Sequence, residues 1–171
     1  MKTTMRRALT IGGLLLVAAI VLAPAIQAKD IKVGAAINLT GPASTWGQYH
    51  AKGTQDYFRY VNEVKGGVKG TKVTMITVDT AYKPAEAVAA VRKFAMQEKV
   101  DMIATWGAGE GIQAKPLLQK FKIPALNYST AWELLQPPVD YMFLPFGSYK
   151  LDCAVVMEYI AAVHKGPRAP K

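Results

Sequence analysis

Hydroxyl, glycine and aromatic residues gather in three short loops of this sequence, and each loop directly follows an apolar run. The loops are Leu39–Gly47, Thr105–Gly111 and Asn127–Ala131. Glycine lets the backbone approach a small ligand closely, and the start of a helix offers unpaired N–H groups to a carboxylate. These residue types in these positions therefore indicate binding of a small solute through hydrogen bonds.

The three tryptophans sharpen that hypothesis. Trp46, Trp106 and Trp132 each lie in or beside one of the three loops. Any one of them could pack against its own domain, but three at equivalent positions favour an aromatic wall around a cleft. Tyr82, which follows another apolar run, could extend this wall. Such a wall indicates a ligand with an aliphatic or aromatic body and a polar head.

Catalytic chemistry has little support in the sequence. His50 and His164 lie on predicted helices, and no motif places a nucleophile near either of them. The sequence contains no Gly-x-Ser-x-Gly motif and no His or Cys spacing that suits a metal ion. We therefore expect a protein that is not an enzyme and that uses no metal and no cofactor.

The segment Gly107–Gly111 resembles a phosphate-binding loop only superficially. Its spacing is not Gly-x-Gly-x-x-Gly, and Glu110 would repel an anionic phosphate near the start of the next helix. A nucleotide site is therefore disfavoured. Glu110 could instead meet a ligand ammonium group or point to solvent, and the residues alone leave both alternatives open.

The charge of the chain gives no sign of a nucleic-acid partner. Residues 29–171 carry a net charge of +6, because 3 of the 21 basic residues precede them and all 12 acidic residues remain. The basic residues are scattered and never form a run interleaved with exposed aromatic residues. They are better explained as a solvated surface.

The first 28 residues have the features of an export signal. Lys2, Arg6 and Arg7 precede the apolar stretch Ile11–Leu22, and Pro24 comes before the small-residue site Ala25-Ile26-Gln27-Ala28. An uncleaved anchor is the alternative, although the apolar stretch is short for a membrane span. Cys153 is the only cysteine, so no internal disulfide is possible. We expect a cleaved signal peptide and a periplasmic protein.

Strand-like and helix-like segments alternate along the rest of the chain. An apolar run starts at Ile31, and a helix that Ser44 or Thr45 could cap follows it and ends at Gly66-Gly67. A second helix begins at Pro84, a position that suits proline as a first helical residue. Further strands are expected at Lys72–Val78, Val100–Thr105, Ile123–Asn127 and Tyr141–Leu144, with a third helix at Gly109–Phe121. This alternation predicts an α/β fold with a doubly wound parallel sheet.

Four ordered segments resemble one known family. They read IKVGAAINLTGPASTWGQ, GGVKGTKVTMITVDTAYKPAEAVAAVRKF, VDMIATWGAGEG and IPALNYSTAWEL. Together they resemble the type I periplasmic solute-binding proteins of the branched-chain amino acid (leucine-isoleucine-valine) ABC transporter family, from about Ile31 to Tyr159. The resemblance implies two α/β lobes that close over a small ligand, which membrane permease subunits then receive. We expect a monomer.

The resemblance also implies how the chain is divided. Residues 29–144 correspond to the N-terminal ligand-binding lobe, and residues 145–171 to the hinge and the first helix of a second lobe, at Tyr149–Val163. The chain stops where the family would begin its next strand, so we expect a product truncated after the first lobe. With no second lobe to cover, the helix at 149–163 should make few contacts with the rest of the chain.

The resemblance further assigns the ligand contacts. In the family, the residue matching Tyr128 contributes backbone, and the one matching Thr130 offers its N–H and hydroxyl to the α-amino and α-carboxylate groups. Where the family often has a Ser-Ser pair, this chain has Gly107-Ala108, which removes a hydroxyl donor. Thr130 could alternatively cap a helix with Glu133. The expected ligand-binding residues are Ser44, Trp46, Trp106, Gly107, Ala108, Tyr128, Ser129 and Thr130.

Two hypotheses for function follow. The first is the substrate-binding component of an ABC import system, which captures a branched-chain or other amino acid, or a related carboxylate, between two lobes. One lobe offers only half a site, so we expect millimolar affinity or weaker from this chain alone. The alternative is an exported sensor or enzyme domain with the same lobe architecture.

Overall fold

A computed structural model describes residues 29–166 and contains one parallel β-sheet. Its five strands lie in the order β2-β1-β3-β4-β5, and every neighbouring pair is parallel. The strands are β1 (Ile31–Ile37), β2 (Val73–Asp79), β3 (Met102–Trp106), β4 (Ala125–Tyr128) and β5 (Met142–Phe143). The carboxyl ends of all five strands therefore meet at one edge of the sheet.

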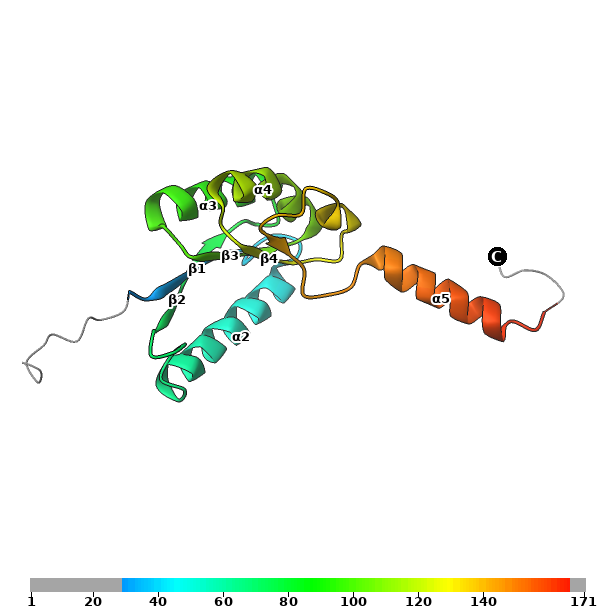
Figure 1. Cartoon of the computed structure of the whole chain (residues 1–171), viewed down its shortest axis with the longest axis horizontal. Helices are drawn as coiled ribbons and strands as arrows, with labels where there is room; N and C mark the ends of the chain where they lie inside the picture. Colours follow the sequence, from blue (N-terminus) through cyan, green and yellow to red (C-terminus); the bar gives the residue numbers. More distant parts are fainter. Residues whose placement is uncertain (1–28, 167–171) are drawn as a thin grey trace, which may run out of the picture.

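Helices lie on both faces of this sheet (Figure 1). The helix α2 (Ser44–Glu63) lies on one face, whereas α3 (Pro84–Lys93) and α4 (Ala108–Phe121) lie together on the other. The π-helical turn Phe94–Glu98 continues α3, and a short 3-10 helix, Trp132–Leu135, follows β4. The predicted α/β fold with a doubly wound parallel sheet is confirmed, and Pro84 is the first residue of its helix.

The start of α2 differs from the sequence-based expectation. Ser44 is already the first helical residue, and Ala43 occupies the cap position without a side-chain hydrogen bond. The expected cap by Ser44 or Thr45 is therefore wrong. The Asn38 side-chain amide holds this turn instead, because it donates a hydrogen bond to the Ala43 carbonyl at 3.1 Å.

Most of the hydrophobic core lies on the face that α3 and α4 cover. Phe94, Val91, Ile103 and Leu118 are all fully buried there. Phe94 packs directly on the backbone of β1, where a Cβ at Gly34 would lie 2.6 Å from the ring. Each fully buried side chain of this kind contributes about 1.5–3 kcal/mol through removal of its surface from water. This face therefore anchors the strands whose ends carry the loops.

The last helix, α5 (Tyr149–Val163), extends away from the rest of the molecule (Figure 1). None of its residues is buried, and Val155, Val156 and Tyr159 are each more than half exposed. Its first turn is tied to the sheet edge by the Tyr149 N–H, which donates to the Thr130 carbonyl at 3.1 Å. As expected from the sequence, the apolar stripe of this helix does not enter the core. Among residues 29–166, no helix is long and apolar enough to cross a membrane.

Candidate functional site

The end of β2 fixes the position of the first loop. One carboxylate oxygen of Asp79 accepts hydrogen bonds from the backbone N–H groups of Leu39 (2.8 Å), Thr40 (3.2 Å) and Ala81 (2.9 Å). Its second oxygen accepts one from the Thr40 hydroxyl at 2.6 Å. Desolvation acts to raise the pKa of Asp79, but these hydrogen bonds outweigh it and hold the pKa below its usual value. Asp79 thus ends its strand and joins two loops.

A hollow of about 630 Å³ lies at the carboxyl edge of the sheet. Its wall comes from the loops that follow β2, β3 and β4 and from the start of α5. Six of the eight predicted ligand-binding residues line it, namely Trp106, Gly107, Ala108, Tyr128, Ser129 and Thr130. The structure therefore brings together two of the three loops that the sequence singled out.

Ser44 and Trp46 lie outside the wall of this hollow. Both belong to the first turn of α2, and the Trp46 side chain is 71% exposed. Trp46 therefore does not pack into its own domain, which was the alternative for this residue. It stands at the same edge of the sheet without touching the hollow.

Aromatic rings dominate the wall of the hollow. The Tyr82 and Trp106 rings meet edge to face with their centroids 6.0 Å apart, and Trp132 lies in the same wall. The ammonium group of Lys150 lies 4.6 Å from the centre of the Trp132 ring, a distance at which a cation and an aromatic ring attract each other. The hollow thus combines apolar surface with one positive and one negative side chain, Lys150 and Glu133.

Four residues of the wall were missed by the sequence analysis, and one of them, Glu133, was considered only as a capping partner. The other three, Phe146, Tyr149 and Lys150, come from the segment after β5 and from the first turn of α5. The signal that could have found them was available, because they also follow a strand that ends at the same edge. The brevity of that strand, Met142–Phe143, hides the signal.

Thr130 does not cap the helix that follows it. That helix starts at Trp132, and its cap residue is Ala131, which makes no side-chain cap. Ser129 holds this turn instead, because its hydroxyl oxygen accepts the Ala131 N–H at 3.1 Å. The capping box of Thr130 with Glu133 is therefore wrong, since the helix begins one residue too late for it. This leaves the Thr130 side chain in the wall of the hollow.

Gly107 occupies the turn between β3 and α4. Its φ of 95° belongs to the left-handed region that favours glycine. A Cβ at this position would lie 2.7 Å from both the Glu110 carboxylate and the Tyr82 ring. Glu110 itself is only 1% exposed, so the alternative in which it points to solvent is wrong. Its side chain lies behind the loop and does not line the hollow.

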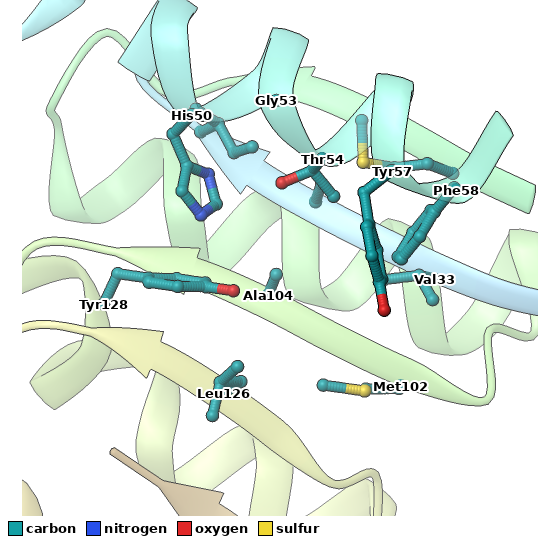
Figure 2. A pocket seen from close by; sticks show the side chains of 13 residues that line it. Val33, His50, Gly53, Thr54, Tyr57, Phe58, Met102, Ala104, Leu126 and Tyr128 are labelled. Carbon is teal, nitrogen blue, oxygen red and sulfur yellow. The ribbon is translucent and has the colours of Figure 1, made fainter. Parts of the chain in front are cut away.

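A second, apolar groove of about 520 Å³ lies between α2 and the sheet. Figure 2 shows His50, Thr54, Tyr57 and Phe58 of α2 around the groove, with Val33, Met102, Ala104, Leu126 and Tyr128 of the sheet. Tyr128 lines both the groove and the hollow, and its ring centroid lies 4.1 Å from that of His50. Burial lowers the pKa of His50 and raises the pKa of the Tyr128 phenol.

Within residues 29–166, no group of three or more His, Cys, Asp and Glu side chains is placed to hold a metal ion. Cys153 is exposed on α5.

This architecture defines a class of protein. A parallel α/β sheet whose loops surround a hollow at the carboxyl edge of the strands is the arrangement of a small-ligand-binding lobe. The chain belongs to the periplasmic binding protein family, whose profile matches residues 30–169.

Curated relatives fall within the same family. The Leu/Ile/Val-binding protein of Citrobacter freundii is 39% identical over 66 residues, which are 39% of this chain and 18% of that protein. The Leu/Ile/Val-binding protein BraC3 of Rhizobium johnstonii is 37% identical over 78 residues, which are 46% of this chain and 21% of that protein. The aligned parts thus span about a fifth of each relative.

Solved structures have the same fold. A branched-chain amino acid ABC transporter protein from Thermus thermophilus, solved with bound valine, is 30% identical, with a TM-score of 0.71 over 83% of this chain and 40% of that one. A substrate-binding protein of an ABC transporter from Aeropyrum pernix is 27% identical, with a TM-score of 0.68 over 80% of this chain and 36% of that one. This chain therefore covers less than half the length of either protein. Two of these four proteins are named as Leu/Ile/Val-binding proteins and two as ABC transporter proteins, of which the Aeropyrum one is a substrate-binding protein.

Proposed function

We propose that this chain is the N-terminal lobe of the substrate-binding component of an ABC import system. Its ligand is a small amphipathic solute, a branched-chain or other amino acid or a related carboxylate. The hollow at the carboxyl edge carries this proposal, because it combines Thr130, the Gly107 turn and a wall of aromatic rings. The valine bound to the Thermus relative is a ligand of this kind.

The geometry suggests how such a ligand would lie. Its carboxylate would meet the free N–H groups at the start of α4 and the Thr130 hydroxyl. Its apolar body would lie against Trp106 and the neighbouring rings of the wall. Lys150 and Glu133 in the same wall would offer opposite charges to the carboxylate and the ammonium group of an amino acid.

The remaining parts of the proposal concern the whole protein. Residues 1–28 would be a signal peptide that is cleaved on export to the periplasm, and permease subunits would receive the ligand from a monomer. Residues 29–144 would form the first lobe, and 145–171 the hinge and the first helix of a second lobe. The exposed apolar side chains of α5 support this division, since a second lobe would cover them.

The affinity of this lobe alone should be weak. Its hollow is open to solvent, so each hydrogen bond to a ligand competes with water and contributes only about 1 kcal/mol. A few such bonds barely offset the cost of immobilising the ligand, which places the dissociation constant at about 1 mM or weaker.

NMR titrations with valine, leucine and phenylalanine, followed by the chemical shifts of the backbone amides, would test this function. The chain would be produced in a bacterial periplasm from the full sequence and titrated with each ligand by NMR. We expect shifts at Gly107 and Thr130 that saturate only in the millimolar range. Thr130→Ala should remove the shifts and Thr130→Ser should keep them. A micromolar constant would contradict the half-site argument, and shifts confined to other residues would contradict the site.

A further inference from the structure

Behind the candidate site lies a layer of buried polar side chains. Asn38, Thr80 and Asn127 are fully buried, and Glu110 is 1% exposed. Asn38 and Thr80 follow the adjacent strands β1 and β2, Asn127 lies in β4, and Glu110 lies in the first turn of α4. Because side chains alternate along a strand, Asn38 and Thr80 point to the same face as Ala36 and Val78, which is the face that α3 and α4 cover.

The strand register shows that this layer is compact. Ile37 pairs with Asp79, so Asn38 and Thr80 follow on adjacent strands. Ala36 pairs with Thr105, so Gly107 comes level with Asn38 on the other side. Neighbouring strands are about 4.8 Å apart. Asn38 therefore lies between Thr80 and Gly107.

Glu110 lies close to both Gly107 and Thr80, the two residues that flank Asn38. Its Oε2 lies 2.7 Å from the position that a Cβ of Gly107 would occupy. The Thr80 hydroxyl is close enough to oppose the rise in the pKa of Glu110, although no hydrogen bond of standard geometry joins the two groups. On the far side, the Asn127 amide donates to the Gly107 carbonyl at 3.1 Å. The layer thus surrounds the Gly107 turn.

Acceptors outnumber donors in this layer. Within the described chain, Asn38 Oδ1, Asn127 Oδ1, Thr80 Oγ1 and both Glu110 oxygens have no hydrogen-bond partner. The two amide groups already donate elsewhere, Asn38 to Ala43 and Asn127 to Thr105 and Gly107. The protons left to give are one N–H of the Asn38 amide and the hydroxyl protons of Thr80 and Thr105, and none of them makes a hydrogen bond to a Glu110 oxygen. A charged carboxylate here would add a buried acceptor that nothing satisfies, at a high cost in free energy.

We propose that Glu110 is a positioning residue that the folded lobe keeps protonated in acidic solution, where it donates its proton to an acceptor of this layer and thereby holds the Gly107 turn in its ligand-accepting shape. Protonation turns the Glu110 carboxylate, neither of whose oxygens has a hydrogen-bond partner, into a hydrogen-bond donor. The part of this proposal that concerns the ligand rests on the proposed function, whereas the protonation does not.

The surroundings of Glu110 favour the uncharged acid. Burial, reinforced by the negative charge of Asp79, raises its pKa from 4.5 to about 7, and the Thr80 hydroxyl opposes part of that rise. The groups that face it from β1, β3 and β4 are neutral. At the start of α3, Lys83 and Glu86 are exposed to solvent, and the Tyr82 ring covers the Gly107 side.

This arrangement fixes the sign of the pH dependence. The folded state binds the proton more tightly than the unfolded state, so the stabilisation is complete below pH 4.5 and is lost as the pH rises to about 7. In between, the folding equilibrium constant should fall up to about tenfold for each pH unit. Above about pH 7 the loss is complete.

Glu110→Gln provides the test, because glutamine keeps the shape of the protonated acid and carries its own donor but cannot ionise. The matched control is Glu86→Gln, an exposed residue in the first turn of α3. All three chains would be produced in the periplasm from the full sequence, and their unfolding in urea would be followed from pH 5 to pH 8.5. We expect the parent and E86Q to lose stability as the pH rises. E110Q should lack the part of this loss that comes from the ionisation of Glu110.

A pH slope of E110Q equal to that of the parent would overturn the proposal, as would a marked loss of stability of E110Q at pH 5. The effect of Glu110 on ligand binding would be tested by NMR titrations of the parent and E110Q with valine at pH 5.5 and pH 8.5. The Gly107 shifts should weaken at the higher pH in the parent but not in E110Q. Equal titrations of both chains at both pH values would refute the positioning role. If neither chain binds at either pH, the proposed function fails, while the urea experiment still decides the protonation.

Discussion

The two faces of the sheet differ in how completely they are covered. On the α3 and α4 side, two helices and the Phe94 turn bury a large cluster of apolar side chains. On the α2 side, the buried cluster is small and consists of Ala35, Ile37 and Ala51, and an apolar groove remains open over β3 and β4 (Figure 2). The strands are apolar on both faces, but one helix covers only part of the second. The stability of this lobe should therefore depend mainly on one face.

The largest expected effect comes from removing the anchor of the well-covered face. Phe94→Ala should destabilise the chain by about 3–5 kcal/mol, because the ring is fully buried against β1 and the cavity cannot collapse. Tyr57→Ala, on the open face, should change stability by less than about 1 kcal/mol, since that side chain is 63% exposed. Urea unfolding of both variants measures the difference. Similar losses would show that the two faces contribute equally.

A smaller effect distinguishes the first turn of α2 from its middle. A Cβ at Gly47 would overlap the Asn38 carbonyl oxygen, so Gly47→Ala should cost about 1–3 kcal/mol. Gly53, on the same helix and beside the groove, has nothing within 4 Å of its Cβ position. Gly53→Ala should stabilise the chain by about 0.5–1 kcal/mol, because alanine favours the helix. A destabilised G53A would mean that the middle of α2 is as tightly packed as its first turn.

Much of the fold could be predicted because short stretches of the sequence determine where strands and helices form. Buried parallel strands are continuous apolar runs, and the alternation of such runs with amphipathic segments leaves few topologies. The same rule explains why six of the eight predicted residues line one hollow, since strand ends converge at one edge. It failed at Phe146, Tyr149 and Lys150, because the two-residue strand before them has almost no sequence signal.

The environment of Glu110 could not be predicted for a different reason. A charged residue in the first turn of a helix normally faces solvent, and nothing nearby in the sequence indicates otherwise. Its burial arises from residues distant in the chain, namely Asn38, Thr80 and Tyr82, which only the folded sheet brings together. The start of α2 was missed similarly, because Asn38 holds the turn there in place of a capping hydroxyl.

The smallest expected effect concerns the ionisable group of the open face. His50 lies between α2 and Tyr128, and burial lowers its pKa below 6.5. A group with a lowered pKa stabilises the fold above its ordinary value, and that stability is lost as the pH falls through the folded pKa. The sign is thus opposite to that of Glu110, and the effect should be smaller because His50 is only half-buried. As the pH falls from 7.5 to 5, His50→Gln should therefore gain slightly more thermal stability than the parent, because it lacks this small opposing effect, whereas E110Q keeps it. If H50Q instead followed the parent, the groove would be open enough for water to hydrate the imidazolium fully.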